Sequence, residues 1–132
     1  MNRLRVGVLG AGNIAAAFVE GAAGCQFAEV VAIGSRQQAK ANAFAKKFSL
    51  PKAYGSYSAL IEDKDVDAVY VATPNSVHKD HTIAAARAGK HILCEKPMAL
   101  TLQDAAEMFE EADRYGVRLI EAFPIVRDVV TQ

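Results

Sequence analysis

The fold is decided close to the start of the chain, by the stretch Val6-Gly7-Val8-Leu9-Gly10-Ala11-Gly12-Asn13-Ile14-Ala15. An apolar, strand-forming run leads directly into a GxGxxA sequence, and small residues at helical spacing follow. In such a loop Gly10 permits the tight turn, Gly12 lets a pyrophosphate approach the backbone, and Ala15 lets helix and strand pack closely. The helix start at Asn13 and Ile14 adds free N–H donors for an anion. We therefore interpret the stretch as a dinucleotide-binding strand–turn–helix rather than a purely structural glycine turn.

Short strand-like runs alternate with longer helical patterns along the rest of the chain. This alternation is typical of βαβ units around a parallel sheet. Helical spacing is clearest at residues 14–23, 38–48 and 102–115, and glycines at 89 and 116 mark helix ends. The sequence therefore predicts an α/β fold with a doubly wound, mostly parallel sheet, whose strands lie at residues 5–9, 30–34, 53–54, 68–71, 91–94 and 118–121.

The last predicted helix, over residues 102–115, shows how the helices are expected to pack. Thr101 stands at the N-cap position, and the acidic Asp104 lies in the first turn. Carboxylates occupy what we expect to be the solvent face of this helix. The expected apolar face consists of Ala105, Ala106, Phe109 and Ala112.

The balance of charges argues against a polyanionic partner. The chain of 132 residues carries 15 basic and 15 acidic side chains, and its formal net charge is zero. No long-range field therefore favours nucleic acid or an anionic membrane. No apolar stretch approaches the roughly 18 residues that a membrane-spanning helix needs, and the N-terminus lacks a signal-peptide pattern. These observations favour a cytoplasmic protein.

Neither the cysteines nor the histidines are spaced like metal ligands. Cys25 and Cys94 lie far apart and form no CxxC pair, so each is expected to be a small buried hydrophobic residue. His81 and His91 are expected to be surface or packing residues. The sequence therefore predicts no metal site.

The identity of the dinucleotide is indicated about twenty residues after the glycine loop, at the end of the second predicted strand. An NAD-binding domain usually places an Asp or Glu there to hold the ribose 2′-hydroxyl. This chain has Ser35 and Arg36 instead, which can hydrogen-bond a 2′-phosphate and pair with its charge. The sequence therefore favours NADP(H). If Arg36 only begins a solvated helix, NAD(H) is the alternative.

Two further motifs follow the fourth and fifth predicted strands: Ala72-Thr73-Pro74-Asn75-Ser76-Val77-His78 and Glu95-Lys96-Pro97. The chain also contains Gly89-Lys90-His91 and Glu121-Ala122-Phe123. Combined with the glycine loop, in this order and spacing, these motifs resemble the Gfo/Idh/MocA family of NAD(P)-dependent oxidoreductases. The resemblance covers nearly the whole chain, and the combination is more specific than any one motif. It implies a Rossmann domain that binds a nicotinamide dinucleotide.

The resemblance also implies roles for individual residues. Glu95 would contact the cofactor's ribose, and Lys96 would lie between the cofactor and a substrate hydroxyl as the catalytic residue. The Lys96–Pro97 bond is a candidate cis peptide bond. A solvated loop lysine at position 96 and a helix cap at His78 are the simpler alternatives. By resemblance, the nicotinamide half of the site would be lined by Thr73, Pro74, Asn75 and His78.

Members of this family continue beyond such a domain into a larger one with an open antiparallel sheet, which supplies the substrate pocket. We therefore expect residues 1–122 to form the dinucleotide-binding domain. Residues 123–132 would be a tail, either an extra edge strand or the start of a missing C-terminal domain. A homodimer through the last strand or this tail is a further expectation, because uncovered apolar surface tends to find partners.

Two functions remain open from the sequence. The chain is either the cofactor-binding half of an oxidoreductase acting on a polyol, sugar or similar small hydroxyl compound, inactive on its own, or a non-catalytic NADP(H)-binding module. A methyltransferase is a weaker interpretation, because it has no place for Glu95-Lys96-Pro97 after the fifth strand.

Overall fold

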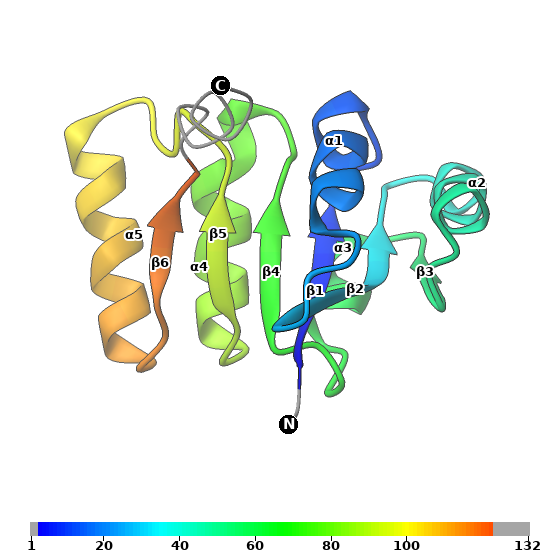
Figure 1. Ribbon diagram of the computed structural model, residues 1–132. Helices are drawn as coiled ribbons and strands as arrows, with labels where there is room; N and C mark the ends of the chain where they lie inside the picture. The colour runs from blue at the N-terminus through cyan, green and yellow to red at the C-terminus, as the bar shows by residue number, and fades with distance from the viewer. Residues whose placement is uncertain (1–2, 123–132) are drawn as a thin grey trace, which may run out of the picture.

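The computed structural model describes residues 3–122. The tail expected at residues 123–132 lies outside the described residues. In chain order the elements are β1 (Leu4–Leu9), α1 (Asn13–Ala22), β2 (Ala28–Gly34), α2 (Gln38–Phe48), β3 (Lys52–Tyr54), α3 (Tyr57–Ile61), β4 (Ala68–Val71), the 3₁₀ turn η1 (Asn75–Val77), α4 (His78–Arg87), β5 (His91–Cys94), α5 (Leu102–Arg114) and β6 (Leu119–Glu121) (Figure 1).

Within residues 3–122, six strands form one sheet in the order β3-β2-β1-β4-β5-β6. Every neighbouring pair is parallel, so the predicted α/β, doubly wound sheet is confirmed. The chain builds outward from β1 to β3, then crosses back to place β4 on the other side of β1. Ligands of such sheets bind at the carboxyl ends of the strands, where the direction of winding reverses.

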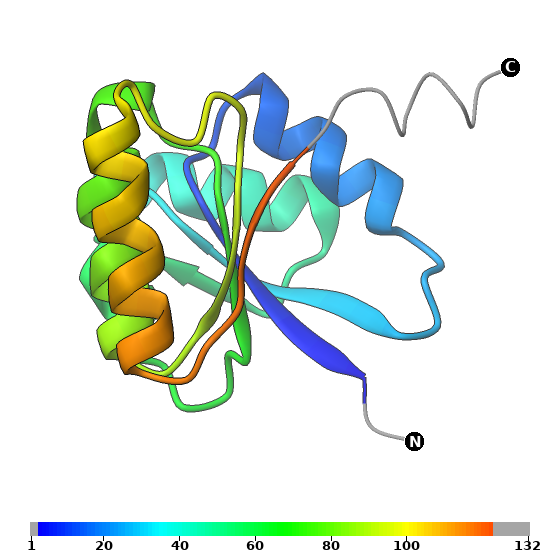
Figure 2. The ribbon, with the colours of Figure 1, turned by 90° about the vertical axis from the view of Figure 1, so that its left-hand side faces the viewer.

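Helices cover both faces of the sheet (Figure 2). Helices α1 and α2 pack on one face, and α3, α4 and α5 pack on the other. Alternation along β1 supplies both cores: Val8 points into the core under α1 and α2, and Leu9 points into the core under α3 to α5. Both side chains are fully buried. The central strand is therefore fixed from both sides.

Two of the sequence-based expectations about packing were wrong. In α5 the most buried side chains are Met108 and Ala112, whereas Phe109 is 45% exposed and Ala106 is exposed. The buried stripe of α5 passes through Met108 and not through Phe109, because α5 packs against α4 and β6 and Met108 enters the core between them. Cys94 is buried as expected, but Cys25 is only half-buried.

Helix α3 was not predicted. It has only 5 residues, too few to show helical periodicity in the sequence. The Ser56 hydroxyl caps it by accepting a hydrogen bond from the Ala59 N–H at 3.2 Å. The N-cap expected at Thr101 is confirmed, because its hydroxyl accepts from the Asp104 N–H at 3.0 Å.

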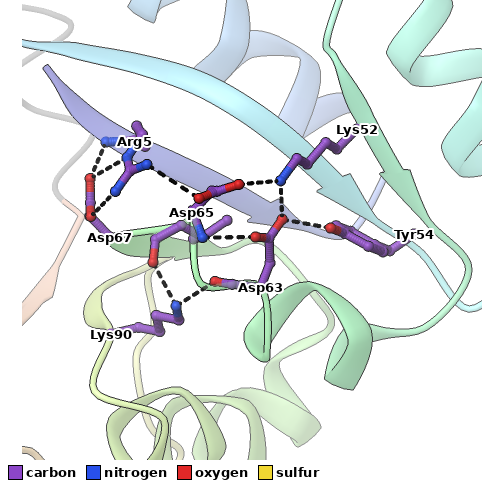
Figure 3. Close-up of polar contacts among 8 residues, drawn as sticks. Arg5, Lys52, Tyr54, Asp63, Asp65, Asp67 and Lys90 are labelled. Atoms are coloured by element: carbon purple, nitrogen blue, oxygen red, sulfur yellow. Dashed lines mark hydrogen bonds and ion pairs between the residues drawn. The ribbon is translucent and has the colours of Figure 1, made fainter.

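A network of charges holds the amino edge of the sheet together (Figure 3). The Asp63 carboxylate accepts hydrogen bonds from the Tyr54 hydroxyl at 2.5 Å and from the Lys52 ammonium at 2.9 Å. Lys52 also contacts Asp65 at 3.0 Å. The loop that follows α3 is thereby attached to β3.

The same loop is attached to β1 and β5. Arg5 forms two side-chain hydrogen bonds with Asp67, each 3.1 Å long. Lys90 is 7% exposed, and its ammonium donates to the backbone carbonyls of Asp63 and Val66, both at 2.6 Å. A single side chain thus binds two backbone carbonyls of this loop.

The Asp63 carboxylate is expected to make stability depend on acid pH. The Tyr54 hydroxyl, assisted by Lys52 and a backbone N–H, lowers the pKa of Asp63 from 3.8 to about 2. Because the folded-state pKa is the lower one, this contribution is present above about pH 4 and is lost as the pH falls towards 2. We expect Asp63→Asn to lower the free energy of unfolding by roughly 1–3 kcal/mol at neutral pH. Urea denaturation at several pH values measures this.

The difference between Asp63→Asn and the unaltered chain should shrink as the pH approaches 2, because protonation then removes from the unaltered chain the charge that the variant already lacks. Glu62→Gln, at an exposed neighbouring position, is the matched control and should leave the curve unchanged. A difference that stays constant from pH 7 to pH 2 would contradict a role for this carboxylate's charge.

Candidate functional site

The candidate residues gather at the carboxyl edge of the sheet, the upper edge in Figure 1. They follow four adjacent strands, β2, β1, β4 and β5, so residues far apart in sequence share one edge. Residues 10–14 follow β1, residues 35 and 36 follow β2, residues 73–78 follow β4, and residues 95 and 96 follow β5. The charge network described above lies at the opposite edge.

Gly10 and Gly12 have different structural roles in the glycine loop. Gly10 has a φ of +101°, and a Cβ at this position would lie 2.8 Å from the carbonyl oxygen of Ala72. Gly12 has ordinary backbone angles, and a Cβ there would meet nothing within 4 Å. Gly10 is therefore required by the fold, whereas the space beside Gly12 is open.

The start of α1 offers donors without a side-chain cap. Gly12 is its N-cap residue, and no side chain accepts from the first turn. Asn13 and Ile14 are exposed at this end, and Ala15, 1% exposed, packs the helix onto the sheet. The first N–H groups of a helix have no partner within it. An anion placed over Gly12 would meet these donors and the positive end of the helix dipole.

At the end of β2, Ser35 is buried and Arg36 is exposed. The Ser35 hydroxyl accepts a hydrogen bond from the Gln37 N–H at 3.3 Å, which shapes the turn into α2. Within residues 3–122 no carboxylate pairs with Arg36. Arg36 is among the residues that line a groove of about 670 Å³ between α3 and α4, and Glu62 lines the same groove. A cation at this place is suited to an anionic group on a ligand.

His78 connects two of the loops at this edge. Its ring is 1% exposed, with Nδ1 2.9 Å from the carbonyl oxygen of Pro97 and Nε2 2.7 Å from that of Thr73. The ring therefore lies between the loop after β4 and the loop after β5. It does not cap the helix N–H groups, because both ring nitrogens face carbonyl oxygens.

The neighbouring His81 also supports the loop after β4. Its Nδ1 lies 2.8 Å from the Thr73 hydroxyl, and its ring meets the edge of Tyr57. Burial lowers the pKa of His81. The expectation that His81 is a packing residue agrees with this position. Pro74 and Asn75 of the same loop are exposed.

The loop after β5 presents Glu95 and Lys96. The Glu95 N–H donates to the Val71 carbonyl at 3.0 Å, and the Tyr70 hydroxyl donates to the Glu95 carboxylate. Lys96 is exposed and is followed by a cis peptide bond to Pro97, as expected. The Met98 N–H donates to the Glu121 carboxylate at 2.8 Å.

Sequence reasoning missed the bond between Tyr70 and Glu95. The two residues are 25 positions apart, and only the register of β4 against β5 brings them together. The alternation of β4 could have placed the Tyr70 ring on the α1 face, but the sequence carries no signal for its partner.

Within the described part of the chain, no group of three potential metal ligands is close enough to hold an ion. In the same part, each helix is too short or too polar to cross a membrane.

Comparisons with known proteins agree with this geometry. A family model described as "Oxidoreductase family, NAD-binding Rossmann fold" matches residues 4–123. D-xylose 1-dehydrogenase (NADP(+)) 2 of Haloferax volcanii is 43% identical over 117 residues, which are 89% of this chain and 36% of that protein. The 1,5-anhydro-D-fructose reductase of Ensifer adhaerens is 46% identical over 115 residues, or 87% of this chain and 34% of that protein.

A solved structure shares the same arrangement. KijD10, a 3-ketoreductase from Actinomadura kijaniata in complex with TDP-benzene and NADP, matches with a TM-score of 0.86 at 37% identity over 98% of this chain and 43% of its own. This chain thus spans about a third of the length of the curated relatives named above, 36% and 34%. With a family model matched over nearly its whole length, the chain belongs to the Gfo/Idh/MocA oxidoreductase family and carries the family's NAD-binding Rossmann fold.

Proposed function

We propose that this chain is the NADP(H)-binding domain of an oxidoreductase that transfers hydride between a nicotinamide cofactor and a small hydroxyl or carbonyl compound, such as a polyol or a sugar. The observation that carries the proposal is the open space at Gly12 beside an uncapped helix start. A pyrophosphate fits this place, because it is an anion that approaches the backbone closely. Residues 10–14 would hold it.

A preference for NADP(H) is supported by the end of β2. A 2′-phosphate on the adenosine ribose would lie near Ser35 and Arg36, and neither of these two positions carries the carboxylate that would repel it. The guanidinium can form charge-assisted hydrogen bonds with a phosphate. The name of the Haloferax relative specifies NADP(+), and the KijD10 structure contains NADP. NAD(H) remains the weaker alternative.

The nicotinamide half would then lie towards β4 and β5. When bound, the nicotinamide supplies the hydride chemistry. The exposed Lys96 ammonium is proposed to hold the substrate's hydroxyl or carbonyl oxygen and to stabilise charge on it. Glu95 is proposed to accept from a ribose hydroxyl. This half of the site is proposed to be lined by Thr73, Pro74 and Asn75. The buried His78 is proposed to hold their loop in place.

The first test separates the two glycines. Gly12→Ala should leave thermal stability close to that of the unaltered chain, because the added methyl group meets nothing, but it should weaken NADPH binding at least roughly tenfold by occupying the phosphate's place. Gly10→Ala should lower the free energy of unfolding by about 2 kcal/mol or more, because the φ of +101° is strained for alanine. Calorimetric titration and thermal unfolding measure both. Tight NADPH binding by Gly12→Ala would contradict the proposal.

The second test concerns the choice of cofactor. The unaltered chain should bind NADPH at least roughly tenfold more tightly than NADH, because a charge-assisted bond contributes about 1.5–3 kcal/mol. Arg36→Ala should remove most of this preference and leave NADH binding nearly unchanged. Lys40→Ala removes an exposed cation of α2 and is the matched control. Equal affinities for NADH and NADPH in the unaltered chain would overturn the NADP(H) preference. Binding without turnover of any polyol agrees with a cofactor-binding half that is inactive on its own, and does not separate it from a non-catalytic module.

A homodimer is the third expectation to test. Among the described strands β6 pairs only with β5, and Ile120 on this edge strand is 55% exposed. Exposed apolar side chains at a sheet edge favour association. Light scattering at increasing protein concentration should show a dimeric mass, which Ile120→Lys should reduce. A monomeric mass at high concentration would contradict it.

A further inference from the structure

Tyr70 is fixed at the centre of the sheet. It belongs to β4, between β1 and β5, and is 3% exposed. The Phe18 ring of α1 stacks on the Tyr70 ring, with centroids 3.9 Å apart and planes inclined by 14°. Stacking of this kind stabilises the pair beyond the burial of the two rings. The position of the Tyr70 hydroxyl is therefore set by β4 on one side and by α1 on the other.

The hydroxyl at the end of this ring donates to Oε2 of Glu95. Burial and the neighbouring Glu95 raise the pKa of Tyr70, so the phenol keeps its proton at neutral pH. Within residues 3–122 Tyr70 supplies the one side-chain hydrogen bond recorded for the Glu95 carboxylate. The Glu95 backbone is held separately, by its N–H bond to Val71 at 3.0 Å. Both the backbone and the carboxylate of Glu95 are thus attached to β4.

The strand order indicates which part of a dinucleotide Glu95 would meet. With the pyrophosphate at the end of β1 and the adenosine at the end of β2, the remaining half must extend over β4 and β5, on the other side of β1. Glu95 follows β5 and contacts the end of β4. Its second carboxylate oxygen can accept from a ribose hydroxyl on the nicotinamide side.

We propose that Tyr70 is a positioning residue, which aims the Glu95 carboxylate at the ribose on the nicotinamide side of the cofactor. This inference rests on the proposed function. Since Phe18 belongs to the same helix whose N-terminus is proposed to receive the pyrophosphate, the stack of Phe18 on Tyr70 also fixes Glu95 relative to that anion. Without the hydroxyl, the carboxylate loses its partner and turns towards water.

The test compares two ligands, NADPH and a shorter one that does not extend to the nicotinamide side of the site. Adenosine 2′,5′-bisphosphate contains the adenosine half and lacks the nicotinamide riboside, so it cannot reach Glu95. Tyr70→Phe keeps the ring stacked on Phe18 and removes only the hydroxyl. We expect this variant to bind NADPH roughly five- to twentyfold more weakly, with its affinity for adenosine 2′,5′-bisphosphate changed less than about twofold. Calorimetric titration measures both.

A matched control is available at the opposite edge. The Tyr54 hydroxyl also donates to a carboxylate, that of Asp63 in the loop before β4. The Tyr54 backbone carbonyl accepts from the Ser35 N–H at 3.0 Å, and Tyr54→Phe removes only the hydroxyl and leaves this backbone bond in place. Tyr54→Phe should lower stability and leave both affinities unchanged. In a Glu95→Ala background, Tyr70→Phe should have no further effect on NADPH affinity, because Tyr70 acts through Glu95.

The outcomes are distinguishable. Unchanged NADPH affinity in Tyr70→Phe, or an equal loss for both ligands, would show that Tyr70 only packs and would overturn the inference. An undiminished effect in the Glu95→Ala background would overturn it as well. If the unaltered chain binds neither ligand, the proposed function itself fails, and the role of Tyr70 fails with it.

Discussion

The approach of Gly10 to the carbonyl oxygen of Ala72 is the contact on which the site depends. β1 and β4 are neighbours, and the Ala72 N–H donates to the Leu9 carbonyl at 2.9 Å. The chain leaving β1 must therefore turn directly beside the chain leaving β4, in a space that has no room for a side chain. This turn places Gly12 at the start of α1 and exposes the donors of its first turn. A larger residue at position 10 would displace both loops at once.

The two edges of the sheet differ in the polar contacts that their residues make. At the amino edge, charged side chains pair with one another and with backbone carbonyls, as Asp63 and Lys90 show. At the carboxyl edge, the exposed cations Arg36 and Lys96 form no ion pair within residues 3–122. The bonds found there connect loops to each other, as His78 does. The polar contacts of the amino edge thus involve mainly charged side chains, whereas those of the carboxyl edge join one loop to another.

Much of the fold could be predicted because it follows from local signals. The GxGxxA stretch, the helix-ending glycines and the Thr101 cap each act over a few residues, and every predicted strand is present with small shifts of its ends. The sequence was less informative where a contact depends on register. The inward side of α5 follows from how it packs against α4 and β6, which made Phe109 a wrong choice and Met108 a missed one.

The residues of the candidate site also differ in how well the sequence predicts their roles. Residues that need a special backbone, such as Gly10, are recognisable from sequence because few residue types can replace them. Tyr70 and His78 act through partners 19 to 25 positions away, and nothing local marks these partners. Their roles became visible only when the strands were placed side by side.

The crossing from β3 to β4 also affects how the chain can fold while it is being synthesised. Arg5 and Asp67, which join β1 to the loop before β4, are 62 residues apart. A ribosome therefore releases β1, with its glycine loop, well before the carbonyl of Ala72 exists to hold that loop in place. During this interval α1 and α2 can cover one side of β1, but Leu9 on the other side waits for α3, α4 and α5. The nascent first half thus presents an apolar strand face to chaperones, and translation that stops early yields a fragment prone to aggregate.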